Sequence, residues 1–323
     1  MKLLVTGGAG YIGSTVATLL VEAGHEVIVL DDLSTGHEDA VPAGARLIRG
    51  RVHDLADEVI TPDLDGVLHF AAFIAAGESV GQPGRYWENN VIGSLRLLEA
   101  VRAAGVARLV FSSTANVYGS PTELPIPESS QLAPPNPYAT SKLSVEYAIT
   151  GAAAAHGFAA VSLRYFNAAG ALIRPTGSVG ERHNPETHLI PNALRVALGQ
   201  QDKLALFGDD YPTPDGTCVR DYIHVADLAT AHLLALEAMQ PGEHRVYNLG
   251  NGTGFSNREV IEVVREVTGH PIPVEMAPRR PGDPAVLVAS SDKAREELGW
   301  TPAKPSLHEI VSDAWTFARA SAR

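Results

Sequence analysis

The sequence predicts an α/β fold: a doubly wound parallel sheet with a second, smaller mixed α/β lobe. Up to about residue 170, short apolar runs alternate with longer helical patterns, as expected for a parallel sheet covered by helices on both faces. A glycine-rich turn directly follows the first apolar run. Beyond residue 170, proline, glycine and polar residues become denser and the elements shorter. We therefore expect one domain over 1–170 and the smaller lobe over 171–323.

The composition supports this size and excludes several classes of partner. With 323 residues and 45% hydrophobic residues, the chain can bury a sizeable core. A formal net charge of −12 argues against a nucleic-acid partner. The single cysteine, Cys218, excludes an internal disulfide and a cysteine-rich metal site, and suits a reducing compartment. No apolar run approaches membrane-spanning length, so we expect a cytoplasmic protein with no membrane partner. We also expect no metal centre.

The first predicted strand, Lys2–Thr6, leads into the glycine-rich turn and then a helical run. Glycines let the backbone turn sharply and approach a pyrophosphate, whose charge meets the N-terminus of the following helix. A preceding strand and a following helix are the context that this fingerprint requires. The predicted dinucleotide contacts in the turn are Gly7, Gly10, Tyr11, Ile12 and Gly13.

The second predicted strand, 26–30, ends at an aspartate pair. A carboxylate here can accept hydrogen bonds from the adenosine ribose diol and would repel a 2′-phosphate. Asp31 and Asp32 therefore favour NAD over NADP as the cofactor. The alternative is that the pair only opens a loop.

The later elements continue the alternation and then change character. Predicted strands are 67–70, 109–112 and 161–164, and predicted helices are 88–104 and 138–155. The loops 71–80, 112–119 and 165–170 follow strand ends and should line a ligand crevice. In the second lobe we expect helices over 191–199, 226–239, 257–267 and 307–320, and strands over 204–207, 219–225 and 245–249. Parts of 217–250 are expected to pack back onto the first sheet.

Tyr138 and Lys142 form the candidate catalytic pair. A helix that begins after Asn136 and Pro137 places them four residues apart on one face. A phenol has a pKa of about 10, which a fixed ammonium and the positive ring of an oxidised nicotinamide would lower. Tyr138 can then take a proton from an alcohol while its carbon loses a hydride. Because any helix can carry this spacing, the pair needs support elsewhere.

Further motifs supply that support. In chain order they are the glycine turn, Ser112-Ser113-Thr114, Tyr138-x-x-x-Lys142 and Arg164-Tyr165-Phe166-Asn167. With these motifs the chain resembles the extended short-chain dehydrogenase/reductases, which implies a Rossmann-type NAD-binding domain. The segments 77–80, 188–191, 219–225 and 278–283 resemble the members that epimerise UDP-hexoses.

The resemblance implies roles for individual residues. Tyr138 is the acid/base, Lys142 holds the nicotinamide ribose and tunes Tyr138, and Thr114 positions the reacting oxygen of the sugar. The further NAD contacts implied are Phe70, Ala71, Ala72, Asn89, Ser112, Ser113 and Tyr165. The UDP-hexose contacts implied, besides Thr114 and Tyr138, are Asn167, His188, Leu189, Phe207, Arg220, Arg280, Asp283 and Leu287.

The two arginines would grip the diphosphate through charge-assisted hydrogen bonds, and Asp283 would bind a ribose hydroxyl. Asp221 and His224 lie in a predicted strand and are interpreted as structural.

The residues after Thr114 point to the reaction. Related dehydratases carry Asp-Glu there, whereas this chain has Ala115-Asn116, so the second acid/base pair needed for elimination is missing. The resemblance then implies NAD-dependent interconversion of UDP-galactose and UDP-glucose by C4 oxidation, rotation of the 4-keto sugar and re-reduction. The alternatives are a nucleotide-sugar dehydrogenase of the same fold and a non-catalytic NAD and nucleotide-sugar sensor.

Three positions depart from the family pattern. Ile74 stands where a lysine usually lies near the pyrophosphate, and Arg51 where an aspartate usually meets the adenine, so we expect weaker NAD retention. Leu287 stands where a bulky tyrosine restricts the sugar pocket of some members, so N-acetylated hexoses can also fit. The alternative is that 285–289 is an ordinary buried strand. The resemblance also implies a homodimer through the helices 88–104 and 138–155, which can equally pack against the sheet.

Overall fold

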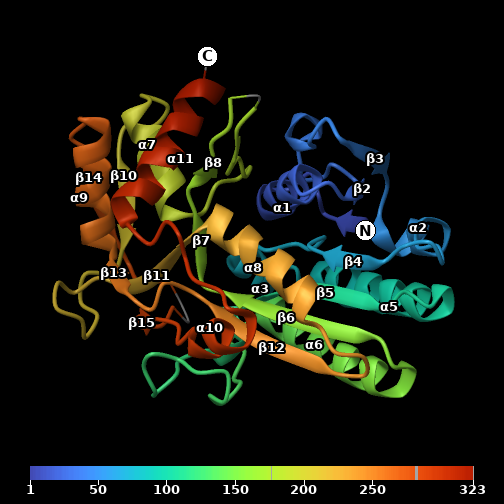
Figure 1. The fold of residues 1–323 in the computed structure, drawn as a ribbon. Coiled ribbons are helices and arrows are strands. Elements are labelled where there is room, and N and C mark those ends of the chain that lie inside the picture. Colours follow the sequence, from blue (N-terminus) through green and yellow to red (C-terminus); the bar gives the residue numbers. More distant parts are fainter. Residues whose placement is uncertain (176, 281–282, 323) are drawn as a thin grey trace.

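The computed structural model describes residues 1–175, 177–280 and 283–322. A parallel sheet flanked by helices lies on the right of Figure 1, and a smaller group of helices and short strands lies on the left. The sheet has seven strands in the order β12-β6-β5-β4-β1-β2-β3, and every neighbouring pair is parallel. This confirms the predicted fold class, and the order reverses between β1 and β4, where doubly wound sheets bind ligands. The strands are β1 (Lys2–Thr6), β2 (Glu26–Asp31), β3 (Ala45–Arg49), β4 (Gly66–His69), β5 (Arg108–Thr114), β6 (Ala159–Tyr165) and β12 (His244–Leu249).

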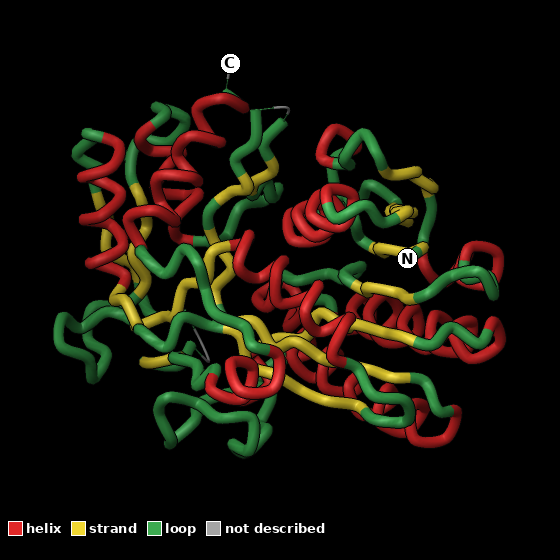
Figure 2. Tube along the Cα trace, in the orientation of Figure 1, coloured by secondary structure: helices red, strands yellow, loops and turns green. Residues whose placement is uncertain are grey.

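Helices cover both faces of this sheet, as the secondary-structure colouring shows (Figure 2). On one face, α1 (Tyr11–Glu22) and α8 (Val225–Ala238) share an apolar core with β1 and β6. On the other, α2 (Val52–Val59), α5 (Gly93–Ala104) and α6 (Pro137–His156) pack against the same strands. A sheet buried on both faces explains why its central strands are near-continuous apolar runs.

The C-terminal half returns to the sheet. Strand β12 pairs with β6 along six residues, and α10 (Asp292–Leu298) joins the core beneath α8. Trp300 is fully buried in that core, and its Nε1 donates to the carbonyl of Asp227 at 2.9 Å. The sequence analysis did not foresee the contribution of α10 and Trp300, and the division of the chain at residue 170 stays a prediction.

The smaller lobe has its own core, in which α7, α9 and α11 pack together. Its elements are α7 (Leu189–Ala197), α9 (Asn257–Thr268), α11 (Leu307–Ser321), β7 (Asn167–Ala169), β8 (Ala171–Leu172), β9 (Val179–Gly180), β10 (Leu204–Phe207), β11 (Val219–His224), β13 (Gly254–Ser256), β14 (Val274–Ala277) and β15 (Val286–Leu287). The remaining short helices are η1 (Glu38–Ala40), α3 (Ala76–Gly81), α4 (Pro83–Tyr86), η2 (Trp87–Ile92) and η3 (Ala115–Tyr118). Among the described residues, none of the helices combines the length and apolarity that crossing a membrane requires.

The predicted helix 88–104 begins differently from an ordinary α-helix. Its residues 88–92 belong to the π-helix η2 (Trp87–Ile92), and α5 follows. Asn90 explains why this wider turn is stable: its side chain accepts from the N–H of Phe73 at 2.8 Å and donates to Ser141 Oγ at 3.1 Å. Such π-turns are frequent at functional sites, and this one ties the loop after β4 to the helix that carries Tyr138.

Candidate active site

One large cavity of about 1470 Å³ lies where the carboxyl ends of the sheet strands face the smaller lobe. Small-molecule pockets usually measure about 300–1,000 Å³, so this cavity is large enough for two ligands. Every site residue predicted from the sequence lines it. The structure thus brings the predicted NAD and UDP-hexose contacts together, while the role of each residue stays a prediction.

The glycine turn forms a cradle that a larger side chain would fill. Gly7 has a φ of +71°, and a Cβ there would lie 2.5 Å from the backbone nitrogen of Ala71. A Cβ on Gly13 would lie 2.2 Å from the carbonyl oxygen of Gly7. The backbone can therefore pass close to a ligand at the N-terminus of α1, as a pyrophosphate site requires. The residues present fit a dinucleotide.

Asp31 braces the cradle and also faces the cavity. Its Oδ2 accepts from the N–H of Ala9 at 2.9 Å and its Oδ1 from the N–H of Leu33 at 2.8 Å. Burial raises the pKa of Asp31, although both N–H groups counteract this rise. The carboxylate therefore has a structural role in the loop, which is compatible with a further bond to a ribose hydroxyl.

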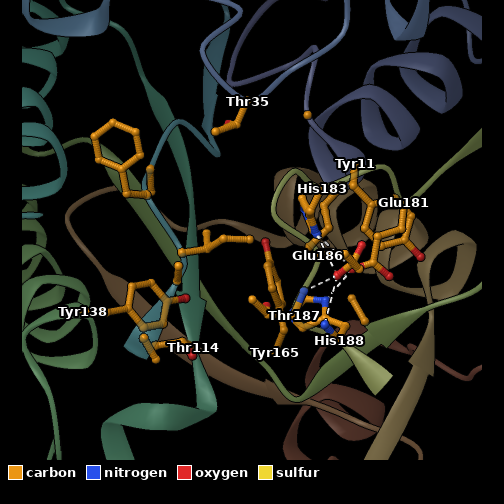
Figure 3. Close-up of a pocket in the computed structure, with 18 of the residues that line it drawn as sticks. Tyr11, Thr35, Thr114, Tyr138, Tyr165, Glu181, His183, Glu186, Thr187 and His188 are labelled. Atoms are coloured by element: carbon orange, nitrogen blue, oxygen red, sulfur yellow. Dashed lines mark hydrogen bonds and ion pairs between the residues drawn. The ribbon is translucent and has the colours of Figure 1, made fainter. Parts of the chain in front are cut away.

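The candidate catalytic pair, Tyr138 and Lys142, is positioned by the start of α6. Asn136 caps this helix by accepting from the N–H of Ala139 at 2.9 Å, and Pro137 occupies its first turn. Tyr138 and Lys142 are both buried within one helical turn, and Thr114 at the end of β5 lies beside Tyr138 (Figure 3).

Two opposing influences act on these side chains. Burial raises the pKa of Tyr138, and its hydrogen bond with Thr114 lowers that pKa in part. Burial lowers the pKa of Lys142 to about 7, against the charge of Glu146. The Lys142 ammonium donates to the carbonyl of Ser112 at 2.8 Å, which fixes its Nζ at the end of β5. Because burial lowers the pKa of Lys142, its protonation depends on the charge of any ligand bound beside it.

A buried polar network holds α6 against the central sheet. Arg164 Nε and Nη2 donate to the two oxygens of Glu146 at 3.0 and 2.6 Å. Ser113 Oγ donates to Glu146 Oε1 at 2.5 Å, and Arg164 Nη1 donates to the Tyr118 hydroxyl at 2.8 Å. Since Glu146 lies one turn beyond Lys142, this network fixes α6 relative to β5 and β6.

The predicted diphosphate contacts lie at the lobe side of the cavity. Arg220 on β11 pairs with Asp283 at 2.5 Å, and the guanidinium carbon of Arg280 lies 4.1 Å from the ring centroid of Phe207. Leu287 on β15 is the register partner of Arg220, is 6% exposed and packs in a small apolar cluster. It is thus both a buried strand residue and part of the cavity wall.

Asp221 and His224 have structural contacts, in agreement with their interpretation from the sequence. Asp221 accepts from the backbone N–H groups of Asn251, Gly252 and Ala289 at 2.7, 2.9 and 3.1 Å, and burial raises its pKa to about 6. His224 Nδ1 accepts from the N–H of Ala226 at the start of α8.

The sequence analysis missed a segment of the cavity wall between β9 and α7. It contains Glu181, His183 and Glu186, next to the predicted contact His188. Burial lowers the pKa of His183, but the hydrogen bonds and charges of Glu181 and Glu186 outweigh this effect and raise it to about 10. The sequence feature that could have indicated this segment is the presence of two glutamates and two histidines among residues 181–188.

The parallel sheet, the glycine cradle and the cavity together define the class of enzymes that work with a bound dinucleotide. The sequence profile of the NAD dependent epimerase/dehydratase family matches residues 3–250. The chain therefore belongs to this family. It is similar to the UDP-glucose 4-epimerase of Corynebacterium glutamicum, with 58% identity over 99% of this chain and 96% of the relative. It is 61% identical to the UDP-glucose 4-epimerase of Streptomyces lividans over 97% of this chain and 95% of the relative. The structure of the UDP-glucose 4-epimerase from Bifidobacterium longum in complex with NAD+ and UDP superposes with a TM-score of 0.94, at 37% identity, covering 100% of this chain and 99% of that one.

Proposed function

We propose that the protein interconverts UDP-galactose and UDP-glucose in an NAD-dependent reaction, a step of galactose metabolism. The observation that carries this proposal is the grouping of Thr114, Tyr138 and Lys142 in one cavity beside the dinucleotide cradle. Ala115 and Asn116 follow Thr114 and begin the short helix η3, so they supply no second acid and base. NAD, when bound, would accept a hydride from C4 of the sugar and return it.

The side chains of this protein move the proton and hold the sugar. Tyr138, as phenolate, takes the proton of the C4 hydroxyl and later returns it, while the Thr114 hydroxyl aligns that oxygen. Lys142, held by the carbonyl of Ser112, stabilises the phenolate by its charge. Burial opposes both charges, so each charged group depends on the other: the ammonium favours the phenolate, and the phenolate favours the ammonium.

Inversion requires that the 4-keto sugar turns over while the nucleotide stays bound. Arg220 and Arg280 face the cavity from the lobe, where they can bind the diphosphate by charge-assisted hydrogen bonds. The volume of the cavity leaves room for the hexose to rotate. The rotated sugar would then present the opposite face of C4 to a cofactor held in the dinucleotide cradle.

The decisive experiment incubates purified protein with UDP-galactose and no added cofactor, then separates the two UDP-hexoses. Conversion to a stable mixture without accumulation of NADH supports an epimerase. Accumulating NADH would instead support a dehydrogenase, and binding without turnover, with NAD in excess, a sensor. Turnover of UDP-N-acetylglucosamine in the same assay tests the proposal that Leu287 leaves room for an N-acetyl group.

Ile74→Lys is expected to strengthen the retention of NAD. Ile74 is 45% exposed and lines the cavity, so a lysine there can place an ammonium near the pyrophosphate. A charge-assisted hydrogen bond contributes about 1.5–3 kcal/mol, which corresponds to roughly a 10- to 100-fold lower Kd. Isothermal titration with NAD measures the change. Ile74→Met is the matched control, and an equal gain in this variant would show that side-chain length, and not charge, causes the effect.

We also propose a cytoplasmic homodimer. Helices η2, α5 and α6 cover one sheet face and carry exposed apolar side chains on their outer sides, namely Trp87, Ile92, Leu95 and Tyr147. Sedimentation equilibrium is expected to give twice the chain mass. Leu95→Glu is expected to shift the protein towards monomer, because it places a charge in the apolar contact. A wild-type monomer at all concentrations would contradict the proposal.

A further inference from the structure

The segment 181–188 brings two carboxylates and two imidazoles to one point. One oxygen or nitrogen from each of Glu181, His183, Glu186 and His188 lies within 4.8 Å of one from every other. Figure 3 shows the four side chains converging on the opposite side of the cavity from Tyr138. The carboxylate side chains are only 7% and 2% exposed. The proposed proton transfer uses none of these four side chains.

The spacing of the four groups suits a tetrahedral metal ion. His183 Nδ1 lies 3.0 Å from Glu181 Oε1 and 3.8 Å from Glu186 Oε1. His188 directs its own Nδ1 at the same oxygen of Glu181, and the two imidazole rings meet edge to face at 85°. In a zinc site with bonds of about 2.0–2.2 Å, ligand atoms lie about 3.3–3.6 Å apart. The His183 distances bracket this range, whereas His188 Nδ1 and Glu181 Oε1 lie closer and would have to move apart by about an ångström to admit an ion.

The charge of the cluster also favours a cation. Two buried carboxylates require compensating positive charge, and across the described ranges the only ion-pair partners of Glu181 and Glu186 are His183 and His188. The two imidazoles supply this charge only while they are protonated. A divalent ion would displace those protons to solvent, supply both charges itself and bind the freed imidazole lone pairs. Glu186 Oε1 additionally accepts from the N–H groups of Thr187 and His188 at 2.8 and 2.9 Å, which orients the carboxylate as outer contacts orient metal ligands.

We propose that Glu181, His183, Glu186 and His188 form a four-coordinate Zn²⁺ site. Nitrogen and oxygen ligands in this number suit zinc, and four protein ligands make a closed, structural site. This proposal departs from the sequence analysis, which expected no metal and assigned His188 to the substrate.

The site would fix the segment 181–188 against the dinucleotide cradle. His183 packs edge-on against Tyr11 of α1, with ring centroids 6.4 Å apart. Arg182 pairs with Asp39 at 2.6 and 3.0 Å, and its carbonyl lies 2.9 Å from His37 Nε2. Zinc would therefore hold the lobe side of the cavity against the side that carries the glycine turn.

The test measures metal binding by the untagged full-length protein after chelator treatment. Titration with Zn²⁺ against a chromogenic chelator is expected to give one tight site per chain, and Co²⁺ is expected to give the strong visible absorption of tetrahedral coordination. Zn²⁺ is also expected to raise the Tm of the wild type. Glu186→Gln and His183→Ala are each expected to weaken Zn²⁺ binding by at least about 100-fold, because losing a ligand costs more than losing an outer contact.

His37→Ala is the matched control, because it removes an imidazole that contacts the same segment outside the cluster. Its Zn²⁺ affinity is expected to equal that of the wild type. Wild-type binding no tighter than that of Glu186→Gln, or a weak octahedral Co²⁺ spectrum, would overturn the proposal and leave a metal-free ion-pair cluster. Glu186→Gln keeps the shape of the side chain, so circular dichroism can verify its fold. None of these readouts depends on epimerase turnover.

Discussion

Tyr138→Phe is expected to lower kcat for UDP-galactose by about 10²- to 10⁴-fold, the usual contribution of a positioned acid/base. The hydroxyl is the only group removed, and the ring keeps its buried position beside Thr114. Binding of NAD and of the UDP-hexose should therefore persist. Steady-state kinetics and equilibrium titration of both ligands separate the two effects.

Tyr147→Phe is the matched control, because Tyr147 lies on the same helix but is 63% exposed. It should retain wild-type kcat. Full activity of Tyr138→Phe would remove Tyr138 from the mechanism, whereas loss of ligand binding together with activity would indicate a structural role.

Glu146→Ala is expected to destabilise the protein by about 3–5 kcal/mol. The change leaves the guanidinium of Arg164, whose side chain is 5% exposed, buried without its bidentate partner, and an unpaired buried charge carries a penalty of this size. Guanidinium chloride unfolding monitored by circular dichroism gives the free energy of unfolding, provided that the transition is two-state.

The double variant Glu146→Leu, Arg164→Met is expected to recover most of that loss, since removing both charges removes the unpaired one. Some loss will remain because Ser113 and Tyr118 also lose hydrogen-bond partners. A double variant as unstable as Glu146→Ala would show that the ion pair is not the source of the destabilisation.

The central sheet could be predicted because its strands are buried on both faces. Lys2–Thr6 forms a strand of this sheet with the bounds expected from its apolar run. Leu204–Phe207 also has the expected bounds, although it lies in the two-stranded sheet of the smaller lobe. Strand β3 gave no such signal, because it is an edge strand whose residues are half-buried or exposed. The short strand β7 was also missed, and β15 was expected only as the alternative of a buried strand over 285–289. Two or three residues show no periodicity, and both strands owe their pairing to β11.

The candidate site was predictable where chemistry requires particular residues at short spacing, as in the glycine turn and the pair Tyr138 and Lys142. The Glu146 and Arg164 network was not, because its members lie on different elements and meet only after folding. The cluster at 181–188 is local in sequence, but histidine and glutamate spacing in a loop predicts no geometry. Its convergence follows from the path of the backbone between β9 and α7.

The return of β12 and Trp300 to the parallel sheet has a consequence for synthesis of the chain. Strand β6 pairs with β5 on one edge, but its other edge stays unpaired until β12, which ends at residue 249, has left the ribosome. The core beneath α8 stays incomplete until Trp300 follows. An unpaired strand edge is prone to association with other chains. The nascent protein therefore passes most of its elongation with an incomplete nucleotide-binding half, and chains stalled before residue 249 are expected to require chaperones or to be degraded.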